Sequence, residues 1–357
     1  MEFGSTILHN VESLIWDEEA GDYLLCRVPE PTRLGLNMKA QRNILFASNS
    51  EIRFVMKGDS AVLGLRRMPA KGDIRSQGVL EVFQGDYQGS YEISPWSVTA
   101  DRTEITIRRQ DWSAVQRFAG NGYSFHPSVT RILLPYDWGC CLRDIKGDIR
   151  PPKKQEMPGK RLLVYGSSIT HGGNASVPSG TYAFRLARKL GYDLINLGCA
   201  GSCQMDEAMA SYIGSRDDWD MALFELGVNV IETWDGDRLY GKALAFLAAV
   251  LEARPDKQVF VTDMYYNRYD FEGDKRAARF RGAIQRCAAV LSGQYGGRLH
   301  YINGLKAMDT PQGLSSDGLH PSDLGHEMIA ERPIRHCINA AKEKSVNTAT
   351  PKKRARH

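Results

Sequence analysis

The stretch RLLVYGSSITHGG, residues 161–173, joins an apolar run to a turn made of small residues. The run stops at Gly166, and Ser167 and Ser168 follow it with no large side chain between them. Two interpretations are open at this point. Either the serines only keep a turn narrow, or one of them is a nucleophile presented at the end of a buried strand. The surrounding sequence has to decide between them.

Strand and helix patterns alternate from this stretch onward. Near-continuous apolar strands, each followed by a helix, predict a parallel five-stranded sheet with helices on both faces, which is a three-layer α/β/α domain. The predicted strands lie at 161–165, 193–198, 221–227, 258–265 and 298–304, and the predicted helices at 181–191, 205–214, 238–255, 274–296 and from about 321 onward. In such sheets ligands bind at the carboxyl ends of the strands. The loops after the strands are therefore the place to look for a functional site.

Residues 6–146 have a different pattern, with short β-like segments separated by turn residues about every ten positions. This spacing predicts an all-β sandwich, similar to a jelly roll, with little helix. Turns are expected at Gly58–Ser60 and at Gly85–Asp86. A linker at 147–160, rich in proline and lysine, is expected between this domain and an α/β domain at 161–342.

The composition is that of a globular protein with a nearly neutral body. Of the 357 residues, 42% are hydrophobic and 25% are charged, and no apolar run approaches the ~20 residues of a membrane span. The net charge is +4, and four basic residues lie in the last six positions, within a tail at 343–357 that we expect to be disordered. A neutral body argues against nucleic acid as a partner, and no membrane partner is expected.

The seven cysteines have no spacing typical of a disulfide framework or a zinc site. We therefore expect free thiols, no metal and no cofactor. Free thiols, and an N-terminus without a basic and apolar leader pattern, favour a cytoplasmic location. The opening residues MEFGS resemble a cloning scar. A leader removed ahead of them, and with it a location other than the cytoplasm, is therefore an alternative.

Four loops after predicted strands carry residues suited to acyl transfer. Ser168 follows the first strand, Gly201 the second and Asn229 the third. Asp317 and His320, three residues apart, follow the fifth strand. A histidine oriented by a carboxylate can take the proton of a serine hydroxyl, and preplaced N–H donors stabilise the oxyanion that forms on attack. Each segment alone is a weak signal, but the four in this order favour a nucleophilic serine.

Residues 160–340 resemble the SGNH, or GDSL, hydrolase superfamily. Its four blocks contain the Ser of GDS, the last Gly of NxGxxG, the Asn of GxN and the pair DxxH, which Ser168, Gly201, Asn229, Asp317 and His320 match. The resemblance implies that Ser168 is the nucleophile, His320 the base and Asp317 its acid partner. It also implies that the Ser168 N–H, the Gly201 N–H and the Asn229 side chain form an oxyanion hole.

The sequence departs from the family pattern at two positions. The Asp usual before the nucleophile is Ser167, and the Asp usual after the block-three asparagine is Val230. Neither missing Asp is the acid of the triad, so the mechanism is unaffected in principle. The departures put the local positioning of the nucleophile turn, and substrate preference, in doubt.

Structural roles are the alternative for each of these residues. Ser168 is then a turn serine, Gly201 a turn glycine with positive φ and Asn229 a loop cap. Asp317 is then the cap of the closing helix, and His320 is a partly buried structural histidine. The joint occurrence of all four blocks favours the catalytic interpretation.

Five further residues near these loops are candidates for substrate contacts: His171, Trp234, Tyr265, Tyr266 and Arg268. Aromatic faces stack on sugar rings, which motivates the choice of the aromatic residues. The alternatives are a surface role for the histidine and, for the aromatic run after the fourth predicted strand, simple cover of the sheet edge.

An all-β domain ahead of an SGNH domain is similar to carbohydrate esterase family 2 acetyl esterases and to some SGNH acyltransferases. The resemblance implies a serine esterase that removes acetyl or other short acyl groups from esters, with O-acylated carbohydrates as the expected substrates. A second hypothesis is an acyltransferase that passes the acyl group to an alcohol, and a third is a non-catalytic carbohydrate-binding protein. The expected partner is a small-molecule or oligosaccharide acyl ester. Candidate roles of the N-terminal domain are glycan binding, completion of the pocket and formation of a homo-oligomer.

Overall fold

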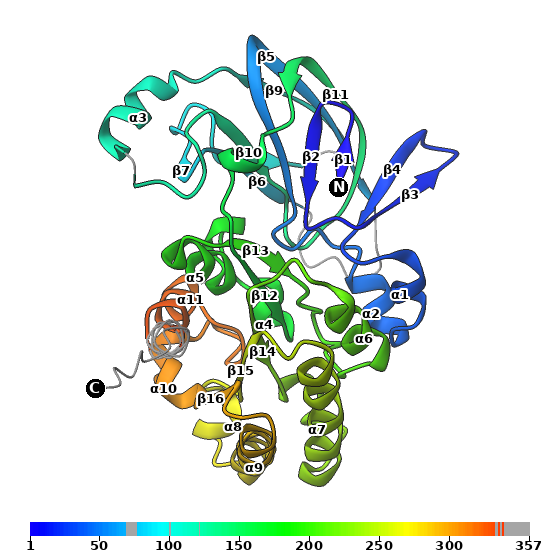
Figure 1. The fold of residues 1–357 in the computed structure, drawn as a ribbon, viewed down its shortest axis with the longest axis vertical. Coiled ribbons are helices and arrows are strands. Elements are labelled where there is room, and N and C mark those ends of the chain that lie inside the picture. Colours follow the sequence, from blue (N-terminus) through cyan, green and yellow to red (C-terminus); the bar gives the residue numbers. More distant parts are fainter. Residues whose placement is uncertain (69–76, 100, 121, 333–334, 336–337, 339–357) are drawn as a thin grey trace, which may run out of the picture.

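The strands form two sheets in the computed structural model, one parallel and one antiparallel. The structure describes residues 1–68, 77–99, 101–120, 122–332, 335 and 338. The antiparallel N-terminal domain, blue to cyan in Figure 1, lies above the α/β domain, which runs from green to orange. The predicted tail at 343–357 lies outside the described residues.

The parallel sheet begins with the apolar run that precedes the paired serines. Its order is β13-β12-β14-β15-β16, and every neighbouring pair is parallel. The strands are β12 (Arg161–Tyr165), β13 (Asp193–Asn196), β14 (Met221–Glu225), β15 (Gln258–Thr262) and β16 (Leu299–Ile302). The five predicted strands are confirmed. Because β12 lies between β13 and β14, the loops that follow these three strands lie side by side at one edge of the sheet.

Helices cover both faces of this sheet because successive side chains of a strand point to opposite sides. Leu162 and Val164 of β12 belong to a core shared with α5 and α11, whereas Leu163 and Tyr165 belong to a core shared with α6, α7 and α9. The helices of this domain are α4 (Ser168–His171), α5 (Tyr182–Leu190), α6 (Glu207–Ser215), α7 (Gly236–Ala253), α8 (Arg268–Phe271), α9 (Lys275–Gln294), α10 (Gly304–Ala307) and α11 (Asp323–Glu331). The predicted three-layer α/β/α arrangement is confirmed.

The N-terminal domain is built from antiparallel pairs, with β5 at its centre. β5 pairs with β2, β9, β10 and β11, and β6 pairs with β7, β8 and β10. Its strands are β1 (Glu2–Phe3), β2 (Thr6–His9), β3 (Ser13–Asp17), β4 (Asp22–Cys26), β5 (Glu51–Met68), β6 (Gly78–Gln84), β7 (Tyr87–Gln88), β8 (Trp96–Val98), β9 (Arg102–Arg108), β10 (Val129–Leu133) and β11 (Gly139–Arg150). A domain rich in antiparallel strands ahead of the α/β domain agrees with the sequence prediction.

One predicted turn in this domain is wrong. The residues Gly58–Ser60 lie inside the continuous 18-residue strand β5. Met56 pairs with Ile149 and Ala61 with Gly147, so that the segment between them bulges from the ladder without reversing the chain. Pairing with β11 on both sides of the bulge overrides the local turn propensity. The predicted turn at Gly85–Asp86 does join β6 to β7, with Gly85 at a φ of 60°.

Helix is limited to short segments in the described part of the N-terminal domain: α1 (Glu30–Leu34), α2 (Met38–Asn43) and α3 (Trp112–Ala119). Strand β11 continues to Arg150, so the first four residues of the predicted linker at 147–160 are strand. The rest of that segment contains the short 3₁₀ turn η1 (Lys154–Glu156). The exact domain boundaries stay a prediction.

The core of the α/β domain continues into the N-terminal domain. A single cluster of buried side chains joins Leu163 and Ile195 of the parallel sheet to Val28, Ala40 and Ile44 of the N-terminal domain. Burial of this apolar surface stabilises the contact between the two domains, at about 25 cal/mol for each Å² removed from water. The segment around α2 is therefore held firmly against the loop that follows β13.

Candidate active site

The paired serines divide two tasks at the end of β12. Ser167 is the N-cap of α4, and its Oγ accepts a hydrogen bond of 3.1 Å from the Ile169 N–H. Ser168 is the first residue of the helix and is only partly buried, whereas Ser167 is 1% exposed. The turn therefore holds Ser167 inside the protein and presents the Ser168 hydroxyl at the carboxyl edge of the sheet.

His320 and Asp317 complete a hydrogen-bonded chain with this serine. His320 Nε2 lies 2.7 Å from Ser168 Oγ, and His320 Nδ1 lies 2.7 Å from Asp317 Oδ2. A carboxylate on Nδ1 keeps the proton on that nitrogen and leaves the lone pair of Nε2 free to accept from the serine. The structure brings the three residues together as the sequence predicted, from loops about 150 residues apart in the chain.

The loop that carries this pair is closed on itself. The Ser315 N–H donates to the His320 carbonyl at 2.9 Å, and Leu314 forms an isolated β-bridge with Pro321. Gly318 sits at the tip with a φ of 68°, a conformation that a residue with a side chain rarely adopts. This closure fixes the spacing between Asp317 and His320.

The Asp317 carboxylate accepts several hydrogen bonds. Oδ1 accepts from the backbone N–H groups of Leu319 and His320, both at 2.9 Å, and Oδ2 accepts from Asn174 Nδ2 at 2.8 Å. Partial burial raises the pKa of this carboxyl, but these hydrogen bonds outweigh it and hold the pKa below its usual range. Asp317 is therefore ionised at neutral pH and can stabilise the imidazolium that forms when His320 takes a proton.

Loss of this carboxylate should cost less activity than loss of the nucleophile. The loss should still be large. In the described residues no backbone carbonyl is hydrogen-bonded to His320 Nδ1, so no other group orients the imidazole when Asp317 is removed. We expect Asp317→Ala to lower kcat by roughly 10⁴-fold, because the imidazole loses its orientation and its preferred tautomer. The measurement is kcat with p-nitrophenyl acetate. Asn174→Ala, which removes one hydrogen bond to the same carboxylate, should lower it by less than about tenfold. A loss in Asp317→Ala as large as that in Ser168→Ala would contradict this expectation.

The predicted oxyanion donors lie on both sides of Ser168. Gly201 follows β13 and has a φ of 60°, and Asn229 lies in the 3₁₀ turn η3 (Val228–Val230) after β14. Asn229 Oδ1 accepts from the Cys203 N–H at 3.0 Å, which leaves its amide nitrogen available. Among the described residues no acceptor is found for that nitrogen or for the N–H groups of Ser168 and Gly201. These donors are therefore free to bind a developing oxyanion.

The N-terminal domain holds the loop that carries Gly201. The Arg27 guanidinium is buried and donates to the carbonyls of Asn196 at 2.8 Å and Gly198 at 2.9 Å. Asn37 Nδ2 donates to the Ser202 carbonyl at 3.0 Å. The loop is therefore fastened on both sides of Gly201 by side chains of the other domain. None of these contacts could be read from the sequence, because they join residues at least 160 positions apart.

A model of the GDSL-like Lipase/Acylhydrolase family matches residues 159–336. The α/β domain of this chain belongs to that family. No curated protein matches the sequence.

Solved structures match both domains at low sequence identity. A salicylyl-acyltransferase from a tetracycline biosynthetic pathway superposes with a TM-score of 0.75 at 17% identity, over 97% of this chain and 96% of that protein. A GDSL-like lipase from Bacteroides ovatus gives a TM-score of 0.66 at 18% identity, over 96% and 98%. A family two carbohydrate esterase from Clostridium thermocellum, solved in complex with cellohexaose, gives 0.59 at 14%, over 83% and 93%. The two-domain fold of this GDSL-like protein is thus similar to those of acyltransferases and of carbohydrate esterases.

Two of the predicted substrate contacts are wrong, because the side chains lie in the interior of the GDSL-like domain. His171 is 2% exposed, and its Nδ1 lies 3.0 Å from the Gly198 carbonyl. Burial lowers the pKa of His171 to about 3, so the ring is neutral. Tyr265 is 1% exposed and packs in the core between the sheet and α5. Adjacency to a motif placed both residues near the site, but their side chains point away from its surface.

The other three predicted contacts are at least partly exposed and stay predictions. Trp234 has the Arg238 guanidinium over its ring at 4.6 Å, and the ring of Tyr266 lies 6.5 Å from that of Phe271. Arg268 also has a structural contact, because its backbone N–H donates to the Gly318 carbonyl at 2.6 Å. Arg268 therefore supports the tip of the loop that carries Asp317 and His320, a role that the sequence did not indicate.

Sequence reasoning missed two polar residues, one bonded to Asp317 and the other to Ser167, which precedes Ser168. Asn174 has a φ of 66° and donates to both Ser315 Oγ and Asp317 Oδ2. Glu225, the last residue of β14, is fully buried and accepts hydrogen bonds from Ser167. A signal for Glu225 was present, because it is a lone carboxylate in an otherwise apolar strand.

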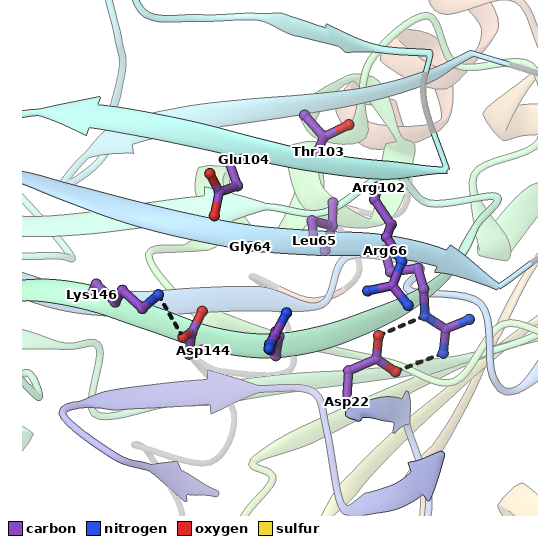
Figure 2. Close-up of a pocket in the computed structure, with 10 residues that line it drawn as sticks. Asp22, Gly64, Leu65, Arg66, Arg102, Thr103, Glu104, Asp144 and Lys146 are labelled. Atoms are coloured by element: carbon purple, nitrogen blue, oxygen red, sulfur yellow. Dashed lines mark hydrogen bonds and ion pairs between the residues drawn. The ribbon is translucent and has the colours of Figure 1, made fainter. Parts of the chain in front are cut away.

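The cavity drawn in Figure 2 lies on the N-terminal domain and contains none of the predicted site residues. Its volume is about 290 Å³, and β5, β9 and β11 line it. Arg66 faces Asp22 across it, at 2.6 Å, and Lys146 lies 3.3 Å from Asp144. Much of its charge is therefore compensated within the protein, and we assign it no ligand. In the described part of the chain, no group of three or more His, Cys, Asp or Glu residues is arranged to hold a metal ion, and no helix is long and apolar enough to cross a membrane.

Proposed function

We propose that this protein is a serine esterase that removes acetyl or other short acyl groups from esters through an acyl-enzyme. The observation that carries the proposal is the continuous chain Ser168 Oγ, His320 and Asp317, with two separations of 2.7 Å. Membership of the α/β domain in the GDSL-like lipase/acylhydrolase family supports an acyl hydrolase in general. The short-acyl preference is inferred from the resemblance to carbohydrate esterase family 2 acetyl esterases, and the roles of individual residues are inferred from the geometry.

The first half-reaction transfers the acyl group to the enzyme. Ser168 Oγ attacks the ester carbonyl carbon while its proton passes to His320 Nε2. The carbonyl oxygen becomes an anion and is stabilised by the N–H groups of Ser168 and Gly201 and by the Asn229 amide. Collapse of the tetrahedral intermediate breaks the bond to the alcohol, which leaves with the proton from His320.

The second half-reaction regenerates the free serine. Water takes the place of the alcohol and gives a proton to His320 as it attacks the acyl carbon. The same donors stabilise the second oxyanion, and the carboxylic acid departs as the proton returns to Ser168 Oγ. Asp317 keeps its negative charge throughout and stabilises the imidazolium in both halves.

We take acylated carbohydrates as the substrate class. The support is the likeness in fold to family two carbohydrate esterases, one of which was solved with cellohexaose bound. Trp234 and Tyr266 are partly exposed aromatic rings in the segments that follow β14 and β15, and such rings suit the apolar face of a sugar. The protein is then expected to release acetate from sugar acetates and to favour short acyl chains over long ones.

A panel of substrates tests this proposal. Acetate release is measured with acetylated sugars, and p-nitrophenol release with p-nitrophenyl esters of increasing acyl length, using wild type and Ser168→Ala in parallel. Serine-dependent release of acetate from sugars, with kcat/KM falling as the acyl chain lengthens, supports the proposal. A folded wild-type protein that hydrolyses none of these esters would overturn it.

Acyl transfer to an alcohol is a second candidate, favoured by the fold likeness to the salicylyl-acyltransferase over nearly the whole of both chains. It uses the same acyl-enzyme, and only the acceptor differs from water. Addition of a carbohydrate or another alcohol to the ester assay distinguishes the two. An acyltransferase forms a new ester at the expense of free acid, whereas the esterase yields the acid whether or not the alcohol is present.

A further inference from the structure

A buried carboxylate lies directly beneath the nucleophile turn. Glu225 ends β14, next to β12, and its side chain is 0% exposed. Its Oε2 accepts from the Ser167 N–H at 2.8 Å, from Ser167 Oγ at 2.6 Å and from Thr170 Oγ1 at 3.1 Å. One oxygen therefore holds residues on both sides of Ser168.

The sequence makes room for this carboxylate at Gly166. A Cβ on Gly166 would clash with Thr170 Oγ1 and would lie 2.7 Å from Glu225 Oε2, closer than real Cβ contacts are found. The family pattern has an Asp where this chain has Ser167. Here a carboxylate is supplied from the neighbouring strand instead, and Ser167 is the residue that binds it.

The second oxygen of Glu225 has no partner among the described residues. Oε1 is buried without a hydrogen bond. No arginine or lysine in the described part of the chain forms an ion pair with Glu225. A buried carboxylate without a counter-ion is unusual, and stability alone does not explain why it is there.

The groups that face Glu225 supply no positive charge. Thr170 and Ser167 face it from α4, Tyr182 from α5, Tyr265 from the loop after β15 and Cys203 from the loop after β13. Burial raises the pKa values of Tyr182, Tyr265 and Cys203, so all three are neutral at neutral pH. Burial likewise raises the pKa of Glu225 to about 7, although the hydrogen bonds from Ser167 and Thr170 oppose it.

We propose that Glu225 is a positioning residue for the esterase, and that its ionised form holds Ser168 in the geometry that His320 needs. A carboxylate oxygen that accepts three hydrogen bonds is best satisfied when the group is negatively charged. Protonation of Glu225 uses one of the lone pairs with which the carboxylate accepts hydrogen bonds. Protonation of Glu225 therefore loosens the nucleophile turn and lowers activity. The inference rests on the proposed function, because it concerns the same serine.

The pH dependence of kcat/KM tests this proposal. A general base must be unprotonated to act, and the proposal adds Glu225 as a second group that must lose a proton, whereas Asp317 is already ionised. The logarithm of wild-type kcat/KM, measured from about pH 5 to about pH 9, should fall on the acid side with a limiting slope approaching two. In Glu225→Gln, which removes only the ionisation of Glu225, the logarithm of kcat/KM should fall on the acid side with a slope of one.

The magnitude of the effect separates positioning from substrate binding. Glu225→Gln should lower kcat at alkaline pH by about 10- to 100-fold and leave KM nearly unchanged, since a small misplacement of the nucleophile affects the chemical step. Glu81→Gln is the matched control. Glu81 is also fully buried and also accepts hydrogen bonds from the N–H and hydroxyl of one serine, but this serine, Ser179, belongs to the 3₁₀ turn η2 (Pro178–Gly180) and not to the nucleophile turn. Its variant should keep the slope and kcat of wild type.

A second variant covers the case in which Glu225→Gln does not fold. Ser167→Ala removes one hydrogen bond that favours the ionised carboxylate, so the ionisation of Glu225 should move to higher pH.

Thermal unfolding gives a readout without substrate. Between the ordinary carboxyl pKa and about pH 7, Glu225 is protonated in the native state of wild type but ionised in the unfolded chain. The free energy of unfolding therefore falls as the pH rises through this window. Relative to wild type, Glu225→Gln should therefore gain Tm over the same window.

The outcomes distinguish this inference from the proposed function. If wild type hydrolyses esters in a Ser168-dependent manner but Glu225→Gln keeps its slope and its kcat, the inference is wrong and the esterase assignment stands. An equal effect of Glu81→Gln would also overturn it, because any buried carboxylate would then suffice. If wild type hydrolyses no ester and the Tm difference between wild type and Glu225→Gln does not change with pH, both proposals fail.

Discussion

Ser168→Ala is expected to lower kcat for p-nitrophenyl acetate by roughly 10⁶-fold, to the level left by binding and the oxyanion donors alone. No acyl-enzyme can form without the hydroxyl, and Ser167 cannot replace it because its hydroxyl is buried and donates to Glu225. In wild type a burst of p-nitrophenol is expected where deacylation is slower than acylation, and the variant should show none.

Folding should be unaffected in this variant. The side chain of Ser168 is partly exposed, and its hydroxyl is hydrogen-bonded to His320. The cap of α4 is provided by Ser167, so the turn keeps its hydrogen bonds. We expect a Tm within a few degrees of wild type, which corresponds to about 1 kcal/mol or less. Serine-independent hydrolysis with an unchanged Tm would show that the nucleophile lies elsewhere.

His320→Ala should cause a loss of similar size, because the hydroxyl then has no base. The side chain of His320 is 24% exposed, so its removal opens a site that small molecules can reach from solvent. Added imidazole should therefore restore part of the activity in His320→Ala and none in Ser168→Ala. The measurement is kcat/KM as a function of imidazole concentration.

The two losses should not add. Ser168 and His320 act as one unit, so the double variant is expected to be no less active than either single variant, within about threefold. A double variant that fell by the product of the two separate losses would mean that the two residues act independently. The 2.7 Å separation between Ser168 Oγ and His320 Nε2 would then have no catalytic meaning.

The parallel sheet was predictable because its signal is local. Each strand is an apolar run followed by small residues, and Gly191, with a φ of 67°, ends α5 where the sequence places the end of a helix. The order of the four blocks likewise reflects the order of the strands. Ser168, Asp317 and His320 could thus be chosen from the sequence.

The errors have a different origin, since they concern which way a side chain points and which strands pair. His171 and Tyr265 adjoin the right loops but face the interior, and adjacency in sequence carries no information about direction. The turn predicted at Gly58–Ser60 was wrong because pairing partners more than 80 residues away keep β5 extended on both sides of the bulge. The sequence places Glu225 in a predicted strand, and only the tertiary structure shows what its carboxylate binds.

The continuous core between the domains has a consequence for how the protein loses activity. Val28, Ala40 and Ile44 belong to the same buried cluster as Leu163 and Ile195 of the catalytic sheet. Two regions that share one core cannot melt separately without exposing it to water. The chain thus looks like two modules in its sequence but should unfold as one cooperative unit, and a destabilising change near Val28, Ala40 or Ile44 should also disorder the loop that carries Gly201.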